Sequence, residues 1–513
     1  MTHYCFHHPV RMRDGAELST ITIRPEETGK YPTVLMRTPY NAKGFVSLAK
    51  GFLDEIPYAF VIQDVRGRYD SQGERFIPFK EKNDSLDTFS WIKKQPWSNG
   101  HVVVFGPSYL GYTALQVLND ECDSIDAVFA PMTFTGPSEG LVYRSGVLQL
   151  HWALPWAIMT STRVQASLKL INGSWPDAFK GPLKNKVKQL GWPQHVWDMF
   201  LSPLDNETWN EARLEFSEPV KSRICLIGGW YDFMLGATLR SYGDLVNAGG
   251  VKPDLIIGGW SHNGYLQSLS GVGDFDLGEQ GKAHAIEDFS NLLKRTETEA
   301  EQLIRVYVLR SNKWLELDEW PPRNIVEEKL YLGGEYDLLQ NPTSESVDFS
   351  IPADPRNPVP TIGGSVWEFP PHLEPGPADQ SSLKNRPDIL RFVSPPFDRP
   401  RTILGPINAE LWVSTPSELS HFTSKLTLID GDSERIIQDG IIPIKQIDET
   451  PTQVCVDLLA TGMEIKKNEQ IGFEISWSNF PKYALSEISK PTVQQVHVSH
   501  SMPSHISIPF LTE

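Results

Sequence analysis

A serine between two glycines follows an apolar run in the segment VVVFGPSYLG, residues 102–111. Open α/β sheets bind their ligands beyond the carboxyl ends of their strands, and a sharp strand-to-helix turn there exposes a nucleophile. The pattern is Gly106-x-Ser108-x-x-Gly111, so its second glycine comes one residue later than in the common G-x-S-x-G motif. Taken alone, the pattern also fits a turn serine that caps the following helix.

A serine hydroxyl attacks a carbonyl only when a base takes its proton, and the base needs an orienting acid. Two later segments, ICLIGGWYD and LIIGGWSH, each consist of an apolar run, the motif GGW and then a titratable residue within two positions. The first presents Asp232 and the second His262, in the chain order Ser, Asp, His of α/β hydrolases. The joint pattern predicts the catalytic triad Ser108–Asp232–His262 and acyl-transfer chemistry.

These side chains need strands that end at one edge of a sheet, and the flanking sequence predicts such strands. Apolar, β-branched runs alternate with helical patterns from about residue 20 to 130 and again from 223 to 295. This alternation is typical of a parallel sheet covered by helices on both faces, so we expect an α/β fold. The predicted strands are 33–38, 59–65, 102–106, 223–230 and 254–260, and the predicted helices are 85–95, 236–248 and 284–295.

Changes in sequence texture divide the chain into four segments. Between about 133 and 218 no strand-like run occurs and tryptophans are dense, which indicates a helical insertion. After about 320 short alternating runs are separated by turn residues, as in a β-sandwich. We expect the two parts of an α/β domain at 1–134 and 219–320, the insertion at 135–218 and the sandwich at 321–513.

The composition argues against several classes of partner. The 513 residues carry a net charge of −17, whereas nucleic acid and anionic membranes require a basic face, so we expect neither as a partner. The four cysteines form no C-x-x-C pair, and we expect neither a metal nor an organic cofactor. The absence of a signal-like or membrane-spanning run predicts a cytoplasmic protein. We expect a small-molecule ester or amide as the ligand, and a homodimer is compatible with the sequence.

Several words of the sequence resemble the CocE/NonD serine hydrolases, the group of cocaine esterase, the X-Pro dipeptidyl-peptidases and the α-amino-acid ester hydrolases. The matching words are RTPY at 37–40, DVRGRYDSQGE at 64–74, QPWSNG at 95–100, GPSYLG at 106–111, GGWYD at 228–232, GGWSH at 258–262, GPINAELWV at 405–413, DGIIP at 439–443 and SHISIPF at 504–510. The resemblance spans most of the chain. It implies an α/β-hydrolase domain, a helical cap inserted into it and a C-terminal, jelly-roll-like β-sandwich.

The resemblance also implies an oxyanion hole. One donor would be the backbone N–H of Tyr109, which follows the nucleophile, and the other the hydroxyl of Tyr40 in RTPY. The residues alone would favour a packing role for Tyr40. The charged residues of DVRGRYDSQGE, at 64–74, are expected to form a structural network of ion pairs instead of a catalytic cluster. Two words depart from the family pattern, DFSNLL at 288–293 and FPKYAL at 480–485, which puts the subfamily in doubt.

Aromatic residues near the predicted acid and in the cap suggest the substrate class. We expect Trp152, Trp156, Trp230 and Phe233 to line an acyl pocket that favours neutral aromatic or bulky apolar acyl groups. Packing among cap helices is an equally good explanation for the cap tryptophans. Met234 and Leu235 stand where the amino-acid ester hydrolases have carboxylates, which disfavours α-amino acyl substrates.

Three alternatives to the hydrolysis of an ester or amide of a neutral aromatic or bulky apolar acid remain at this stage. The same triad serves an acyltransferase, in which an acceptor other than water takes the acyl group. An X-Pro dipeptidyl-peptidase-like activity is a further alternative, although the full enzymes generally carry an additional N-terminal domain. The third is a non-catalytic protein whose β-sandwich binds a partner.

Overall fold

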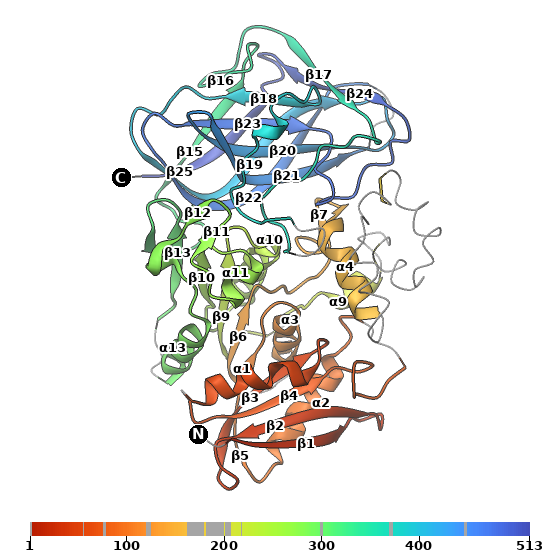
Figure 1. Ribbon diagram of the computed structural model, residues 1–513, viewed down its shortest axis with the longest axis vertical. Coiled ribbons are helices and arrows are strands. Elements are labelled where there is room, and N and C mark those ends of the chain that lie inside the picture. Colours follow the sequence, from red (N-terminus) through yellow and green to blue (C-terminus); the bar gives the residue numbers. More distant parts are fainter. Residues whose placement is uncertain are drawn as a thin grey trace.

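The computed structural model describes residues 3–54, 56–74, 78–119, 125–161, 179–180, 200, 207–216, 218–297, 301–368, 373–445 and 449–512. Figure 1 shows an elongated molecule with an α/β part at one end and an all-β part at the other. The two parts meet along the side of the α/β sheet at which β9 and β10 end. The predicted fold class, an α/β domain followed by a β-sandwich, is confirmed.

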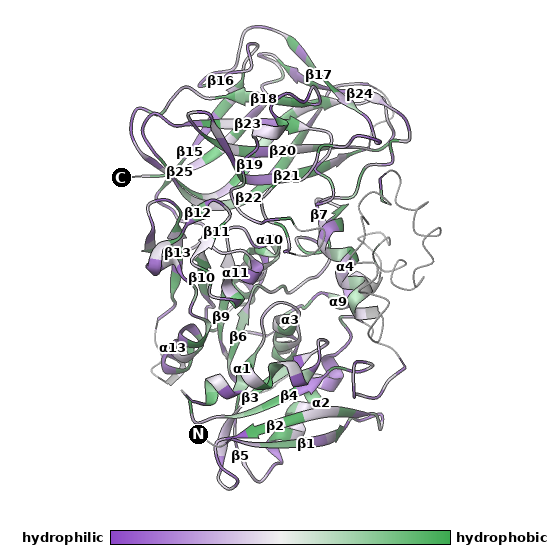
Figure 2. Ribbon diagram, viewed as in Figure 1, coloured by the Kyte–Doolittle hydropathy of each residue, from purple (hydrophilic) through white to green (hydrophobic). Residues whose placement is uncertain are grey.

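A ten-stranded mixed sheet forms the centre of the α/β part. Its seven inner strands, from β4 to β13, pair in parallel, and antiparallel strands lie at both edges. Figure 2 shows these inner strands as largely hydrophobic, as expected for strands covered on both faces. In spatial order the strands are β1 (Tyr4–Arg11), β2 (Glu17–Arg24), β4 (Ala59–Asp64), β3 (Tyr31–Thr38), β5 (Ser98–Phe105), β6 (Ile125–Pro131), β9 (Arg223–Gly229), β10 (Asp254–Gly258), β13 (Ile304–Val308) and β14 (Lys313–Glu316).

Helices cover this sheet and connect its strands. The amphipathic helix α13 shows the principle: Phe289, Leu292 and Leu293 are buried in the core, while Glu287 and Lys294 are exposed. The helices are α1 (Val46–Leu53), α2 (Lys82–Lys93), α3 (Tyr109–Leu115), α10 (Leu235–Ala248), α11 (His262–Leu266), α12 (Gly278–Gly281) and α13 (Ala285–Glu297), with 3-10 turns η1 (Ala42–Phe45) and η2 (Gln116–Asn119) and a hairpin of β11 (Gly271–Val272) and β12 (Phe275–Asp276).

The predicted cap contributes two described helices and a short hairpin between β6 and β9. These are β7 (Tyr143–Arg144), β8 (Val147–Leu148), α4 (Leu150–Ser161) and α9 (Glu207–Ala212). Figure 1 shows α4 and α9 beside the α/β part, below the sandwich. Much of the segment 135–218 lies outside the described residues, and its boundaries stay predictions.

Two antiparallel sheets form the C-terminal sandwich. The seven-stranded sheet contains β16 (Leu338–Leu339), β15 (Ile325–Leu332), β25 (His505–Leu511), β19 (Arg401–Ser414), β24 (Thr492–Val498), β17 (Val347–Ala353) and β22 (Thr452–Ile465), which pairs with β19. The four-stranded sheet contains β18 (Ile389–Val393), β23 (Gln470–Ser476), β20 (Ser420–Asp430) and β21 (Ser433–Ile444), and η3 (Ser381–Leu383) precedes β18.

The sandwich is joined to the α/β sheet by backbone hydrogen bonds as well as by side-chain packing. The amide of Leu309, just after β13, donates to the carbonyl of Gly462 on β22 at 2.9 Å, and Glu464 returns a bond to the Leu309 carbonyl at 3.1 Å. The contact is close, because a Cβ on Gly462 would lie 3.0 Å from the ring of Trp230. The sandwich therefore rests directly on the loop that carries Asp232.

Among the described residues, the structure contains no helix with the length and apolar character needed to span a membrane.

Candidate active site

Ser108 lies on a sharp turn between β5 and α3, in a backbone conformation that is rare for a residue with a side chain. Its φ is 59° and its ψ −129°, and strain of this kind is typical of functional sites. Bonds from neighbouring strands hold the turn: the Ser108 amide donates to the Pro131 carbonyl at 2.8 Å, and the Thr133 hydroxyl donates to the Ser108 carbonyl at 3.1 Å. The Ser108 side chain makes no capping bond to α3, which removes the support for the helix-cap explanation.

The two glycines around Ser108 permit a close approach of helix and strand. A Cβ on Gly106 would lie 2.3 Å from the backbone of Leu110, and a Cβ on Gly111 would lie 2.5 Å from Thr133 Oγ1. The late position of the second glycine has a structural reason: a Cβ on Gly111 would meet both Thr133 and the Gly106 carbonyl, the latter at 2.7 Å.

Asp232 and His262 are brought together by loops that follow adjacent strands. His262 Nδ1 lies 2.9 Å from Asp232 Oδ1, and both side chains are buried. The same Asp232 oxygen accepts a bond from the Met234 amide at 3.1 Å, which fixes the carboxylate on its own turn. A carboxylate at Nδ1 orients the imidazole so that Nε2 can act as a base.

The repeated motif GGW explains why the Asp232 loop and the His262 loop lie so close together. The Tyr231 amide donates to the Trp260 carbonyl at 3.1 Å, and the Trp230 amide donates to the Gly258 carbonyl at 3.0 Å. A Cβ on Gly229 would lie 2.1 Å from that Trp260 oxygen, so only glycine fits there. The acid-bearing and base-bearing loops are thus joined by their backbones, independently of the bond between their side chains.

Tyr40 lies at the same end of the sheet, after β3. Its hydroxyl accepts a hydrogen bond from Trp156 Nε1 of cap helix α4 at 2.7 Å. Burial raises the pKa of the Tyr40 phenol well above its usual value, so the hydroxyl keeps its proton across the working pH range. A phenol that accepts one bond through oxygen retains its own O–H for donation.

Tyr109 is the first residue of α3, so its backbone N–H belongs to the first turn, where helical amides point away from the helix. Its side chain is anchored below the site: the hydroxyl donates to Glu81 and accepts from the Phe79 amide at 2.8 Å. Burial of Glu81 raises the pKa of its carboxyl to about 7, despite the opposing effect of the Tyr109 hydrogen bond and nearby Arg37.

One cavity contains most of the predicted site residues. Ser108 Oγ faces it with Met234 Sδ 3.9 Å away, and the rings of Phe233 and His262 lie 4.7 Å apart between their centroids. The free space is about 30 Å³, room for one or two water molecules. An acyl group must therefore displace side chains to enter. The lining residues are Tyr40, Phe79, Ser108, Tyr109, Phe134, Leu141, Trp152, Trp156, Phe233, Met234, His262 and Trp367.

The structure corrects one predicted pocket residue and adds others. Trp230 does not line the cavity: it is fully buried against the sandwich, and its Nε1 donates to the Tyr307 carbonyl at 2.6 Å. Trp367 does line the cavity, although it belongs to the loop between β17 and β18. No local signal marked Trp367, because its position depends on how the sandwich docks. Phe79, Phe134 and Leu141 were also missed.

Met234 is the additional residue for which the sequence held a signal, since it stands two positions after the predicted acid. Its sulfur lies beside the Ser108 hydroxyl at 3.9 Å. Glu139 is a carboxylate of the predicted cap segment, and a carboxylate in the pocket would favour α-amino acyl substrates. Its Oε1 instead accepts from the Ser145 amide at 2.8 Å in the β7–β8 turn.

The charged word at 64–74 forms a structural network outside the cavity lining. Arg66 binds Asp84 with distances of 2.7 and 3.0 Å, and Asp64 accepts from the Ala42 amide at 2.7 Å. Arg68 donates to the carbonyl of Pro39, beside Tyr40, at 2.9 Å and to the carbonyl of Thr160 in α4 at 2.7 Å. Arg68 therefore ties the Tyr40 loop to the cap helix that supplies Trp156.

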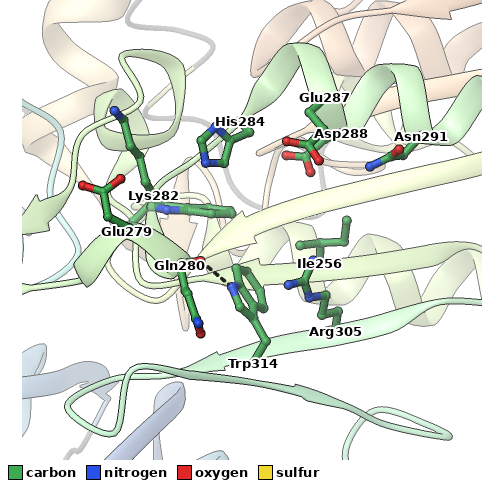
Figure 3. A pocket seen from close by; sticks show the side chains of 11 residues that line it. Ile256, Glu279, Gln280, Lys282, His284, Glu287, Asp288, Asn291, Arg305 and Trp314 are labelled. Carbon is green, nitrogen blue, oxygen red and sulfur yellow. Dashed lines mark hydrogen bonds between the residues drawn. The ribbon is translucent and has the colours of Figure 1, made fainter.

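A second cavity, of about 270 Å³, lies behind the base-bearing loop and is shown in Figure 3. Glu287 and Asp288 of α13 and His284, which precedes that helix, line it, and Trp260 and Trp314 form aromatic walls. It contains none of the predicted site residues. Its structural link to the site is Asp288, whose carboxylate accepts from Tyr265 of α11 at 3.2 Å.

Comparisons with known families match both parts of the chain. Residues 14–264 match the family described as X-Pro dipeptidyl-peptidase (S15 family). Residues 296–506 match the X-Pro dipeptidyl-peptidase C-terminal non-catalytic domain. Cocaine esterase of Rhodococcus sp. (strain MB1 Bresler) is 26% identical over 569 residues, which cover 98% of this chain and 97% of that protein.

Two solved structures share the whole architecture. An aminopeptidase from a marine sediment Thaumarchaeota archaeon superposes with a TM-score of 0.87 at 20% identity and covers 99% of this chain and 97% of its own. An α-amino acid ester hydrolase superposes with a TM-score of 0.79 at 20% identity and covers 99% of this chain and 96% of its own. At this identity the two superpositions establish the fold alone.

Proposed function

Because the chain belongs to the CocE/NonD and S15 group of serine hydrolases, we propose that it cleaves esters or amides of neutral aromatic or bulky apolar acids through Ser108, His262 and Asp232. The observation that carries this proposal is the 2.9 Å bond between Asp232 and His262 on the wall of the cavity that Ser108 faces. A non-catalytic binding protein is disfavoured, since family membership makes the chain a serine hydrolase.

In the proposed reaction, His262 takes the proton of Ser108 while Ser108 Oγ attacks the substrate carbonyl carbon. The Tyr40 hydroxyl and the Tyr109 backbone N–H stabilise the negative oxygen of the tetrahedral intermediate. His262 then gives its proton to the leaving group, and water attacks the acyl-enzyme in the reverse sequence. Asp232 holds the imidazole orientation throughout. The proposed cycle uses side chains, one backbone N–H and water.

The Ser108 hydroxyl lies beside Met234 in the unliganded cavity, so the reaction requires a rotation of the serine side chain towards His262. Loose catalytic hydrogen bonds are common in unliganded hydrolases and tighten when substrate binds. Filling of the cavity by an acyl group that displaces the Met234 side chain provides a physical reason for this rotation.

The lining of the cavity supports the proposed acyl specificity. Trp152 stacks on Phe233 with ring centroids 5.6 Å apart, and the ring of Trp367 is tilted against Phe233 with centroids 6.0 Å apart. Transfer of a flat apolar acyl group from water to such walls is favourable, by about 25 cal/mol per Å² of apolar surface buried. The proposed ligand is accordingly a small neutral ester or amide, and neither nucleic acid nor a membrane surface is proposed as a partner.

Labelling with a fluorophosphonate tests the catalytic assignment. We expect one covalent adduct on the wild-type chain, located at Ser108 by peptide mass analysis. The Ser108→Ala variant should fold normally and take up no label. Thr113→Ser, in the same helix but outside the cavity lining, is a matched control that should label like the wild type. Undiminished labelling of Ser108→Ala would refute the assignment.

Hydrolysis of α-amino acyl substrates is a second candidate, and one observation favours it. Glu368, next to Trp367, accepts a bond from the Asn263 amide through Oε1 at 3.3 Å, while its Oε2 is buried and has no partner among the described residues. A buried carboxylate oxygen at the edge of the pocket is suited to an ammonium group. Two relatives with this fold act on amino-acid substrates according to their names.

A pair of esters separates the two candidates. Phenylacetyl and phenylglycyl esters with one leaving group differ by a single α-amino group, which is charged at neutral pH. The first proposal predicts at least about a tenfold higher kcat/KM for the phenylacetyl ester, about 1.4 kcal/mol in transition-state binding. A preference for phenylglycyl that disappears in Glu368→Gln would establish the second candidate instead.

A further inference from the structure

The β-sandwich supplies hydrogen bonds to the turn that carries Asp232. The Trp230 carbonyl accepts from Gln438 Nε2 at 2.7 Å and from Ser365 Oγ at 3.3 Å. Gln438 belongs to β21, and Ser365 to the loop between β17 and β18. The two side chains also contact each other: Ser365 Oγ lies 3.3 Å from Gln438 Oε1, so its single proton is shared between this oxygen and the Trp230 carbonyl. Two side chains from one domain thus converge on one backbone oxygen of the other.

The side-chain amide of Gln438 is held between the two sheets of the sandwich. The residue is fully buried, and its Nε2 also donates to the Ala460 carbonyl on β22 at 3.0 Å. Its backbone pairs with Leu426 of β20. An amide that is hydrogen-bonded on both sides has few alternative rotamers. The Gln438 side chain therefore fixes the position of the Trp230 carbonyl oxygen relative to the sandwich.

Trp230 is the first residue after β9 and begins the turn that carries Asp232. The Trp230 N–H is held by the neighbouring strand through the Gly258 carbonyl at 3.0 Å, whereas the Trp230 C=O is held by the sandwich; the Tyr231 N–H, in the same peptide unit as that C=O, donates to the Trp260 carbonyl at 3.1 Å. The next residue is tied to the same sheet, since the Tyr231 hydroxyl donates to the Ile436 carbonyl at 3.4 Å. Asp232 follows directly, with its carboxylate 2.9 Å from His262.

We propose that Gln438 is a positioning residue for the Asp232–His262 pair, so that the sandwich, whose family description calls it non-catalytic, takes part in catalysis by fixing the acid-bearing turn. The inference rests on the proposed function of that pair. Without the Gln438 amide, the Trp230 carbonyl keeps only the longer Ser365 bond, and the peptide unit is held mainly through the Tyr231 N–H bond to the Trp260 carbonyl, about which it can tilt. A tilt there displaces the Asp232 carboxylate relative to the imidazole.

The expected signature is a loss of turnover without a loss of binding. A misplacement of about 1 Å in a catalytic group can lower the rate about 10²-fold, so we expect Gln438→Leu to lower kcat by about tenfold or more with KM unchanged. A loosened Asp232 also stabilises the His262 imidazolium less. The acidic limb of the kcat/KM profile should therefore move to lower pH. The other described carboxylates in contact with this loop, Glu368 at Asn263 and Asp288 at Tyr265, are unchanged in the variant.

Gln494 provides a matched control in the same domain. It is a fully buried glutamine on β24 whose Nε2 donates to Ser420 Oγ, and that bond lies within the sandwich. Gln494→Leu removes a comparable buried amide and should cost a similar amount of stability. We expect its kcat and its pH profile to match the wild type within about twofold, because its bond does not reach the catalytic turn.

The experiment measures kcat, KM and pH profiles of wild type, Gln438→Leu and Gln494→Leu with 4-nitrophenyl phenylacetate, together with thermal unfolding of each. A selective fall in kcat for Gln438→Leu supports the inference; equal kcat in all three, or an equal fall in both variants, overturns it. If Gln438→Leu does not fold, Ser365→Ala decides: a kcat lowered by about threefold supports the inference and an unchanged kcat overturns it. A wild type without Ser108-dependent turnover would instead refute the proposed function.

Discussion

Tyr40 allows the sharpest test of the proposed oxyanion hole, because loss of its hydroxyl should lower kcat much more than it lowers the free energy of unfolding. The oxygen accepts a bond from Trp156 at 2.7 Å, and its own proton is available for the cavity. Tyr40→Phe removes both interactions while keeping the ring. Loss of one oxyanion donor lowers kcat about 10²- to 10³-fold, or about 3–4 kcal/mol in transition-state stabilisation. Loss of the Trp156 bond costs about 1 kcal/mol of folding stability.

Trp156→Phe separates these two costs. It removes the same hydrogen bond from the other side and keeps the Tyr40 hydroxyl, so its loss of stability should be similar and its loss of kcat much smaller. Steady-state kinetics with 4-nitrophenyl phenylacetate and thermal unfolding of both variants provide the comparison. An unchanged kcat with a raised KM in Tyr40→Phe would show that Tyr40 binds substrate instead of stabilising the oxyanion. Equal falls of kcat in the two variants would also refute the reasoning.

Three further predictions concern the elements around the site. Asp232→Asn should lower kcat by about 10⁴-fold in steady-state assays and leave the fold intact, since backbone bonds join the two loops; a small effect would remove Asp232 from the triad. Burial raises the pKa of the Glu81 carboxyl from its ordinary value of 4.5 to about 7, so between these two values the folded state holds a proton that the unfolded chain has lost. The free energy of unfolding should therefore fall as pH rises between these values, and denaturant titrations at about pH 5 and about pH 8 should show a smaller fall for Glu81→Gln. Gly111→Ala should destabilise the fold by several kcal/mol, since its Cβ would lie 2.5 Å from Thr133 Oγ1, whereas Gly243→Ala meets nothing within 4 Å and should be tolerated; equal melting temperatures would contradict the packing argument.

Local sequence signals predicted the elements that carry the site, because strand ends and turn chemistry are encoded within a few residues. The predicted strand 59–65 corresponds to β4 (Ala59–Asp64), and the predicted helix 236–248 to α10 (Leu235–Ala248). The strand expected at 102–106 begins earlier, at Ser98, because pairing with Tyr31 of β3 extends it through polar, partly solvated residues. Pairing partners are not visible in a local pattern.

Side-chain directions within the catalytic turn were less predictable. Trp230 and Phe233 flank the same acid in sequence, yet the turn sends one into the domain interface and the other into the cavity. Trp367 lies more than a hundred residues away in sequence and reaches the cavity through domain docking. Such contacts depend on how two folded units meet, and no spacing rule within either unit specifies that. The proposed triad, by contrast, follows from three strand ends of a single sheet.

The position of β25 in the sandwich determines how late in its synthesis the chain can complete its fold. This strand lies between β15 and β19, so the seven-stranded sheet closes only after His505–Leu511 has been made. Every residue of the proposed triad is translated much earlier, before residue 263. Domains fold as units while the chain grows, at about 5–20 residues per second. A chain that ends before β25 would carry all the proposed catalytic side chains and also β21 with Gln438. It would lack β25 in the sheet of β22, the strand that accepts the Gln438 amide at Ala460 and packs against the Trp230 ring at Gly462, so we expect the proposed ester hydrolysis only after β25 has been made.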